Sequence, residues 1–298
     1  MTRLRVGTRG SDLALRQTNW VCQRLRDAHP TLEIEPVVIQ THGDLVTDQN
    51  FGKAWPPGAF VGALENALRD DRIDFAVHSY KDLPTAPTGG LVVAATPERE
   101  VVHDVLVLRC ADRIEELPGG AKIGTNSPRR AAQLLRLGDF QIVPIRGNVP
   151  TRIAKIEREG LDGVVLAAAG LRRLGIRHPH MIELPTDQFL PAPAQGALAV
   201  QTRVGSTAAE LLGVLDHRPT RRAVDAERAF LRRVGAGCHA AAGALARVAG
   251  ETITLHARLF SADYARSAEG LEAGADSEAV GGALADRLWG ELRVASGE

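Results

Sequence analysis

The sequence predicts an α/β protein with a smaller α+β region at its C-terminal end. A repeated order of strand, turn and helix, beginning at residues 2–8, is typical of sheets that are covered by helices. Apolar segments at residues 73–77 and 163–169 match the buried strands of a parallel sheet. Two strands joined near Gly250 and a last amphipathic helix at residues 277–292 favour a separate antiparallel sheet that packs on a helix.

The composition limits the kinds of protein that the chain can be. Its 298 residues are enough for two or three domains with cores of their own. The formal net charge is zero, so no general surface for nucleic acid is expected and any anion site must be local. Three scattered cysteines do not form a disulfide framework or a metal cluster. The charged N-terminus and the lack of a long apolar run predict a cytoplasmic protein that does not enter a membrane.

The first strand is followed by a turn at residues 9–11 and by a helix that ends near Pro30. Ser11 has the side chain of an N-cap, and Arg9 lies beside it. A helix N-terminus that faces the end of a strand binds anions, because free backbone N–H groups and the helix dipole point there. A plain capped helix explains the same residues, and this motif alone favours that simpler interpretation.

Polar residues follow the apolar strand at residues 73–77. Open α/β sheets place ligands at the carboxyl ends of such strands, and here the chain continues with His-Ser-Tyr-Lys-Asp-Leu-Pro at residues 78–84. Two interpretations of Asp82 stay open: a catalytic carboxylate next to Lys81, or a turn residue that bonds its own backbone. The polar segment 40–57, which contains Lys53, is longer than most loops, and long loops in compact domains are often functional.

Arginines follow three successive predicted strands in the middle of the chain. Ser127 before Pro128 is a strong helix start. The arginine pairs are Arg129 with Arg130, Arg146 with Arg152, and Arg172 with Arg173. One arginine pair alone indicates a solvated surface, but three pairs favour a cleft for several carboxylates or phosphates. A guanidinium group binds a carboxylate or a phosphate through two parallel hydrogen bonds. The chain has no phosphate-binding loop of the Gly-x-x-x-x-Gly-Lys-[Ser/Thr] type, so a nucleoside triphosphate is not favoured.

Cys238 follows a helix predicted at residues 220–234 and is preceded by Gly235-Ala-Gly237. Little side-chain bulk surrounds the sulfur, so a large group can approach it. The alternative is an inert, buried cysteine at a helix end, because free cysteine packs as a small hydrophobe. Before this helix, a proline-rich return at residues 191–196 contains Gln195 and is expected to lead the chain back to its first domain.

Seven segments in collinear order resemble the porphobilinogen deaminase family, whose members are also called hydroxymethylbilane synthases. Several segments in the right order are more specific than any one of them. Together they extend over nearly the whole chain: residues 7–15, 76–84, 124–130, 146–152, 168–175, 195–196 and 227–238.

The resemblance implies two α/β domains like the halves of a type II solute-binding protein, followed by a small α+β domain. The cleft between the first two would hold the active site. The expected domains are residues 1–97 with 196–213, residues 98–195, and residues 214–298. A monomer is expected that requires no metal and binds a small-molecule substrate.

The resemblance also implies the chemistry. Family members join four porphobilinogen molecules head to tail with loss of ammonia, and hydrolysis then releases a linear tetrapyrrole. The product grows on a dipyrromethane cofactor, which Cys238 would hold by a thioether. Asp82 matches the carboxylate that stabilises positive charge on pyrrole nitrogens, with Lys81 beside it. The matching cofactor positions are Lys81, Asp82, Ser127, Arg129, Arg130 and Arg146, and the matching substrate positions are Arg9, Ser11, Lys53, Arg152, Arg173 and Gln195.

The chain departs from the family over residues 57–65, where Pro57 and Gly62 replace common basic residues. This departure motivates one alternative, a divergent paralog that keeps the covalent primer but builds another product. A second alternative is a cytoplasmic anion-binding module, because a fold does not fix a function. A binding module has no use for Cys238 together with Asp82, which favours the enzyme.

Overall fold

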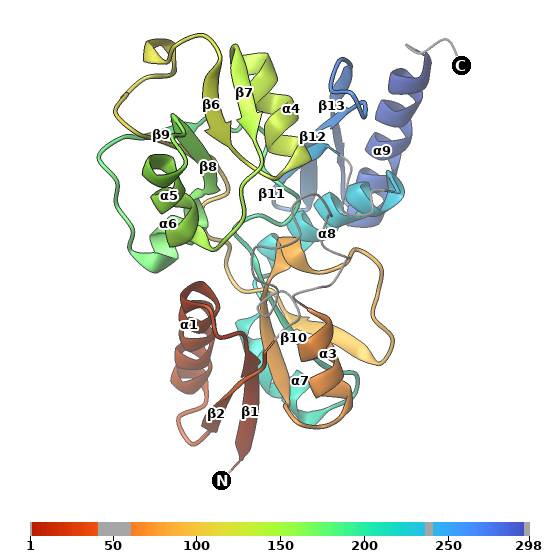
Figure 1. The fold of residues 1–298 in the computed structure, drawn as a ribbon. Coiled ribbons are helices and arrows are strands. Elements are labelled where there is room, and N and C mark those ends of the chain that lie inside the picture. Colours follow the sequence, from red (N-terminus) through yellow and green to blue (C-terminus); the bar gives the residue numbers. More distant parts are fainter. Residues whose placement is uncertain (1, 41–60, 236–240, 295–298) are drawn as a thin grey trace. The chain divides into compact units, whose positions relative to one another are not determined.

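Three β-sheets organise the described part of the chain (Figure 1). The computed structural model describes residues 2–40, 61–235 and 241–294, so the expectations for Lys53, Pro57 and Cys238 lie outside the described residues. The chain divides into two units, which are Met1–Arg99 with Ala197–Arg221, and Glu100–Gly196 with Arg222–Glu298. No helix among the described residues is both long enough and apolar enough to cross a membrane.

The first unit contains a five-stranded sheet in the order β2-β1-β3-β10-β4. Strands β2, β1 and β3 are parallel, and β10 is antiparallel to β3 and to β4. The strands are β1 (Arg3–Thr8), β2 (Glu33–Val38), β3 (Phe75–Ser79), β4 (Leu91–Ala95) and β10 (Leu198–Arg203). Its helices are α1 (Asp12–Ala28), α3 (Gly62–Arg69) and α7 (Thr207–Leu212), with short 3-10 turns η1 (Tyr80–Asp82) and η3 (Gly213–Leu215).

The second unit contains a five-stranded sheet in the order β7-β6-β8-β5-β9. Strands β7, β6 and β8 are parallel, and β5 is antiparallel to β8 and to β9. The strands are β5 (Asp104–Leu108), β6 (Ala121–Gly124), β7 (Phe140–Val143), β8 (Gly163–Ala167) and β9 (Met181–Leu184). Its helices are α4 (Pro128–Leu137), α5 (Val149–Arg158) and α6 (Ala168–Leu174), with the 3-10 turn η2 (Ile114–Glu116).

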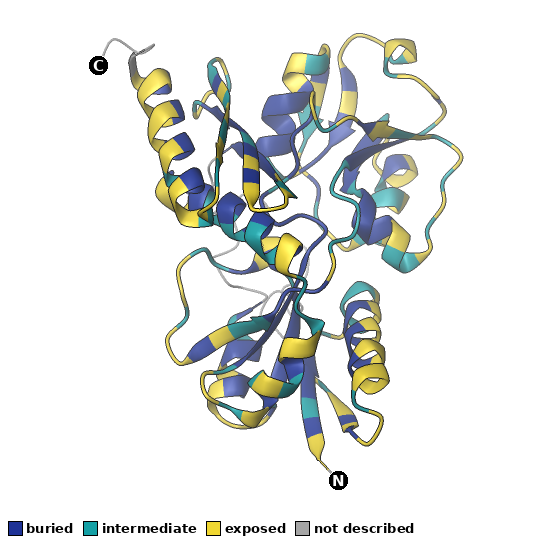
Figure 2. Ribbon diagram, turned by 180° about the vertical axis from the view of Figure 1, so that it is seen from behind, coloured by how far each residue is buried: buried dark blue, intermediate teal, exposed yellow. Residues whose placement is uncertain are grey.

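Both five-stranded sheets therefore have one topology. In each sheet, three parallel strands are followed by one antiparallel strand, β10 in the first unit and β5 in the second. An edge strand, β4 or β9, completes the sheet. Every residue of β5 is buried, as expected for a strand with helices on both faces of its sheet, and Figure 2 shows the central strands in the buried colour. The predicted fold class, two α/β domains with a smaller α+β region, is confirmed.

One predicted strand is shorter than expected. The strand that was expected to lead directly to Arg146 ends three residues earlier, at Val143. The next residue is Pro144, which has no backbone N–H group to continue a ladder, so the chain leaves the sheet there.

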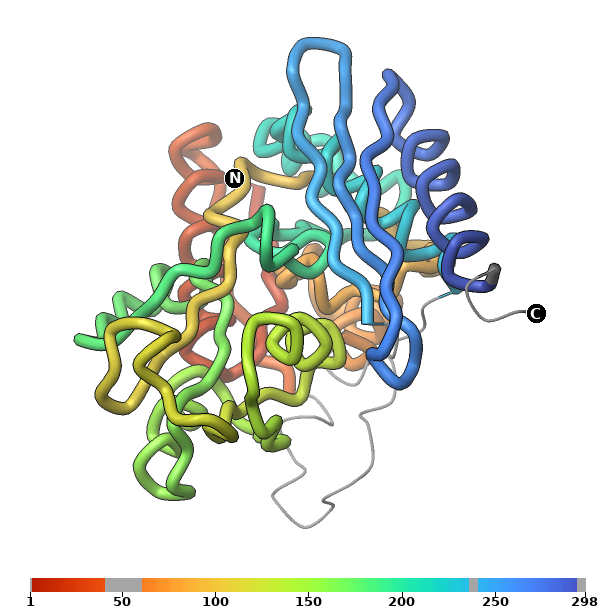
Figure 3. Tube along the Cα trace, turned by 90° about the horizontal axis from the view of Figure 1, so that it is seen from above, coloured from red at the N-terminus to blue at the C-terminus, as the bar shows by residue number. Residues whose placement is uncertain are grey.

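The third sheet is antiparallel and belongs to the second unit. Its order is β11-β12-β13, and α9 packs on it, as Figure 3 shows in blue. The core between sheet and helices includes Phe230, Leu255 and Leu288, all without exposed surface. The elements are α8 (Arg218–Arg233), β11 (Ala242–Ala249), β12 (Thr252–Phe260), β13 (Ser267–Gly274) and α9 (Ser277–Val294).

Two neighbouring glycines of α9 provide a matched test of this packing. A Cβ on Gly281 would lie 2.5 Å from Ala226 O and 2.6 Å from Ala229 Cβ, so Gly281→Ala should lower the free energy of unfolding by about 1–3 kcal/mol through overpacking. A Cβ on Gly282 would meet nothing within 4 Å, so Gly282→Ala should raise it by about 0.5–1 kcal/mol through helix propensity. Urea unfolding measures both changes, and shifts of the same sign would contradict the close contact of α9 with α8.

Candidate active site

In the first unit, side chains from β1, α1 and β3 gather at one edge of the sheet. Because β1 and β3 are parallel neighbours, Arg9 after β1 and Asp82 after β3 follow strands that end at the same edge. Ser11 is the N-cap of α1, and its side chain accepts a hydrogen bond from the N–H of Ala14 at 3.4 Å. Farther along α1, the Gln17 side chain donates to Ser79 Oγ at 2.9 Å, which joins the helix to the end of β3.

Lys81 and Asp82 lie on a tight turn, and the side chains of both residues are exposed. The turn, η1, starts directly after β3 at Tyr80, whose side chain is buried. The N–H of Tyr80 donates to Ala197 O at 3.0 Å, and the N–H of Leu83 donates to Tyr80 O at 3.2 Å. The carboxylate of Asp82 and the ammonium of Lys81 are therefore presented to solvent from a backbone that the sheet holds in place.

His78, two residues before this turn, is buried and does not supply a charge. Burial lowers its pKa to about 4, the side chain of Gln201 opposes this shift, and the positive charge of Arg9 adds to it. Its Nε2 atom has no hydrogen-bond partner among the described residues. At neutral pH the imidazole is therefore neutral, and the positive charges at this edge belong to arginine and lysine.

In the second unit, arginines follow the three parallel strands at one edge of the sheet. Arg129 and Arg130 are in the first turn of α4 after β6, Arg146 lies after β7, and Arg173 is in α6 after β8. Ser127 caps α4, and its side chain accepts a hydrogen bond from the N–H of Arg130 at 3.4 Å. These arginines therefore follow strands that end at one edge of the sheet, as the sequence predicts.

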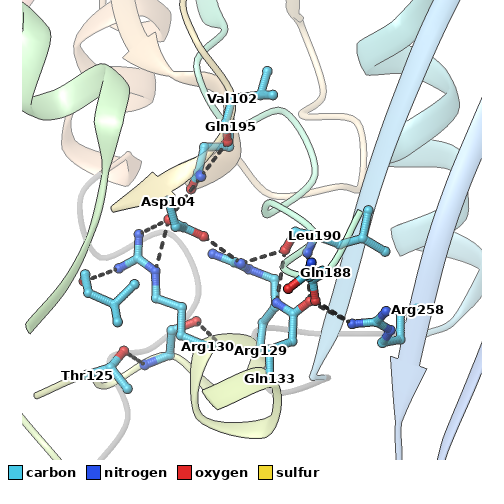
Figure 4. Close-up of polar contacts among 12 residues, drawn as sticks. Val102, Asp104, Thr125, Arg129, Arg130, Gln133, Gln188, Leu190, Gln195 and Arg258 are labelled. Atoms are coloured by element: carbon cyan, nitrogen blue, oxygen red, sulfur yellow. Dashed lines mark hydrogen bonds and ion pairs between the residues drawn. The ribbon is translucent and has the colours of Figure 1, made fainter. Parts of the chain in front are cut away.

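Asp104, the first residue of β5, lies between Arg129 and Arg130 (Figure 4). Its Oδ2 accepts from Arg129 Nη1 at 2.8 Å, and its Oδ1 accepts from Arg130 Nη2 at 2.7 Å and Nε at 3.2 Å. The carboxylate has no exposed surface, and the two guanidinium side chains are 6% and 7% exposed. Since β5 is antiparallel to β8, its first residue lies at the edge where β8 ends.

Gln195 belongs to the same buried cluster. Its Nε2 donates to Asp104 Oδ1 at 3.0 Å and to Val102 O at 2.8 Å, and the residue has no exposed surface. The next residue, Gly196, has a φ of +86°, and a Cβ there would lie 2.5 Å from Glu100 O, so only glycine fits. This burial favours a positioning role for Gln195 over direct contact with a substrate.

The remaining predicted arginines differ in their surroundings. Arg173 donates to Gly196 O at 2.7 Å, and burial lowers the pKa of its guanidinium. Arg172, its neighbour, is half-exposed and lies 3.6 Å from a carboxylate oxygen of Glu100. Arg152 is half-buried, and its Nε donates to Gly147 O at 2.8 Å.

The sequence reasoning missed three residues of this cluster. One feature of the sequence could have indicated Asp104: it is an acidic residue at the first position of an otherwise apolar strand. Gln133 of α4 accepts from the N–H of Leu190 at 2.7 Å, and Arg258 of β12 donates to Gln188 O at 2.9 Å. These two side chains join α4 and β12 to the segment that leads back through Gln195, and nothing local in the sequence indicates them.

The cluster suits a ligand that carries a carboxylate. Asp104 offers one negative charge to two buried guanidinium groups, which leaves a positive charge available to an anion. Among the described residues, the Nε and Nη2 groups of Arg129 donate to no side chain or backbone oxygen, so they can donate to a ligand. This edge of Arg129 therefore fits a ligand carboxylate, and the cofactor that the family resemblance implies bears such groups.

Comparison with known families decides the identity. Residues 4–210 match the dipyrromethane cofactor-binding domain of porphobilinogen deaminase, and residues 222–290 match the C-terminal domain of the same enzyme. The chain belongs to the porphobilinogen deaminase family. The resemblance seen in the sequence is thereby confirmed, and the cofactor-binding domain of the family covers both five-stranded sheets and the arginine cluster.

Curated relatives match along nearly the full chain. The porphobilinogen deaminase of Desulforudis audaxviator is 44% identical over 98% of this chain and 95% of its own length. That of Carboxydothermus hydrogenoformans is 43% identical over 95% and 92%, respectively. Among solved structures, the methionine-binding protein MetQ covers 72% of this chain and 89% of its own, with 14% identity and a TM-score of 0.45.

The buried His78 makes the free energy of unfolding of this protein depend on pH. Its pKa is about 4 when folded and 6.5 when unfolded, so below pH 6.5 the unfolded chain takes up a proton that the folded chain excludes. Stability should therefore fall as the pH falls, by about 2 kcal/mol between pH 7 and pH 5 from this residue. Urea unfolding at the two pH values, compared with His78→Gln, measures this contribution. Parallel losses in the two proteins would show that His78 is not held neutral.

Proposed function

We propose that this chain is a hydroxymethylbilane synthase, which joins four porphobilinogen molecules head to tail and then releases a linear tetrapyrrole. The observation that carries the proposal is the buried arginine cluster within the cofactor-binding domain of the family. Each pyrrole bears an acetate and a propionate, so the growing product is a polyanion. Two buried guanidinium groups that share one carboxylate among the described residues are suited to such a ligand.

Residues of the second unit would hold the cofactor and the growing chain. Arg129 and Arg146 would bind carboxylates, with Ser127 at the N-terminus of α4 beside them. Arg130 was expected to bind them too, but its three nitrogens donate to Asp104 and Val165, so it would support the site from inside. The partial positive charge of that helix end adds to the attraction for anions. Arg152 and Arg173 would contribute at the ends of β7 and β8, and Gln195 would support Asp104 from inside the protein.

Residues of the first unit would act on the reacting pyrroles. We assign Arg9 and Ser11 to carboxylates of the substrate, because they lie at the sheet edge that also bears the η1 turn. The exposed carboxylate of Asp82 would stabilise the positive charge that develops on pyrrole nitrogens and would accept or return their protons. Lys81, also exposed, would pair with a carboxylate of the substrate or cofactor.

The sulfur of Cys238 would form the covalent link, and Lys53 would contact the substrate, although both residues lie outside those that the structure describes. When bound, dipyrromethane supplies the pyrrole carbon to which the first substrate is joined. A thiolate that adds to a cofactor precursor is ordinary cysteine nucleophilicity. We further expect the protein to act as a cytoplasmic monomer.

The intact mass of the purified protein tests the proposal. Wild-type protein incubated with porphobilinogen should carry extra mass that corresponds to a two-pyrrole group, and Cys238→Ser should not. Cys110 is an exposed free cysteine, so Cys110→Ser is a matched control that should load like the wild type. A wild-type protein that stays unmodified, or a Cys238→Ser variant that loads normally, would contradict the proposal.

A further inference from the structure

The two arginines at the start of α4 occupy a place that electrostatics disfavours. They are the second and third residues of the helix, where the helix dipole repels positive charge. Burial lowers the pKa of Arg129, Asp104 opposes this shift, and the neighbouring charge of Arg130 adds to it. The arrangement therefore depends on a negative partner, and Asp104 is that partner in the described chain.

Asp104 does not hold the two arginines in the same way. All three nitrogens of Arg130 are engaged inside the protein, with Nε and Nη2 on Asp104 and Nη1 on Val165 O at 2.9 Å. Arg129 uses Nη1 alone, which donates to Asp104 and to Leu190 O at 2.7 Å. Figure 4 shows both guanidinium groups turned toward the Asp104 carboxylate.

The plane of the Arg129 guanidinium is also supported from one side. Its central carbon lies 5.8 Å from the centroid of the Phe189 ring, and that ring has no exposed surface. One nitrogen and one face of Arg129 are therefore held by the protein. The edge formed by Nε and Nη2 makes no hydrogen bond to a described residue, and this edge binds a carboxylate through two parallel hydrogen bonds.

We propose that Asp104 is a positioning residue for ligand carboxylates: it fixes Arg130 as an internal support and orients Arg129 so that its free edge binds the ligand. This inference rests on the proposed function, because the ligand is the pyrrole cofactor or growing chain. The charge count agrees with it. One carboxylate neutralises one guanidinium, and the second positive charge remains for the ligand.

The test compares two aspartates that each serve two arginines. Asp74 accepts hydrogen bonds from Arg5 at 2.9 and 3.1 Å and lies 3.4 Å from Arg203, but it precedes β3, at the end away from Asp82. After incubation with porphobilinogen, Asp104→Asn should carry the two-pyrrole adduct on a fraction of folded chains that is about tenfold or more below that of the wild type. Asp74→Asn should load like the wild type. Both variants should have lower melting temperatures, so a loss of stability alone would not produce this difference.

A double variant separates orientation from charge. Asp104→Asn with Arg130→Gln keeps the net charge of the cluster but removes the support, so it should also load poorly. If Asp104→Asn is recovered unfolded, Gln195→Met takes its place, because it removes only the amide that donates to Asp104 and Val102, and it should load less than Asp74→Asn.

Three results would overturn the inference. Normal loading of the double variant would show that charge alone matters. Equal loading of Asp74→Asn and Asp104→Asn would remove the positioning role while leaving the proposed function intact. Where Gln195→Met replaces Asp104→Asn, equal loading of Gln195→Met and Asp74→Asn would do the same. A wild-type protein that takes up no adduct would contradict the proposed function and this inference together.

Discussion

The ion pair between Asp104 and the two arginines of α4 is the interaction on which the site depends. A buried guanidinium is unfavourable unless a carboxylate and further hydrogen bonds replace its water. Here one fully buried carboxylate serves two guanidinium groups, and backbone oxygens of Val165 and Leu190 take the remaining inward donors. The result is a buried group of two guanidinium side chains and one carboxylate, with one more positive than negative charge.

The topology of the sheets makes this cluster possible. In a parallel sheet the carboxyl ends of all strands lie at one edge, which brings together the arginines that follow β6, β7 and β8. An antiparallel neighbour begins where those strands end, so the first residue of β5 arrives at the same edge. The first unit repeats the order of strands, and its corresponding edge bears Arg9 and the turn with Asp82.

The sequence predicted the fold class and the gathering of arginines because both follow from local rules. Strand periodicity and helix starts such as Ser127 before Pro128 are visible in a few residues, and sheet geometry then brings the strand ends together. Asp104 was missed because its partners are 25 and 26 residues away, and no local pattern indicates such a pairing. The burial of Gln195 was missed for the same reason, since its acceptors lie about 90 residues earlier in the chain.

The central claim is that this protein joins porphobilinogen molecules with loss of ammonia, and that the reaction needs the carboxylate of Asp82. The most direct test is the ammonia that purified protein releases from porphobilinogen, with Asp82→Asn and the exposed control Asp70→Asn beside it. We expect one ammonia for each porphobilinogen consumed by the wild type and by Asp70→Asn, and a rate lower by about 100-fold or more in Asp82→Asn. No release by the wild type, or an unchanged rate in Asp82→Asn, would contradict this account.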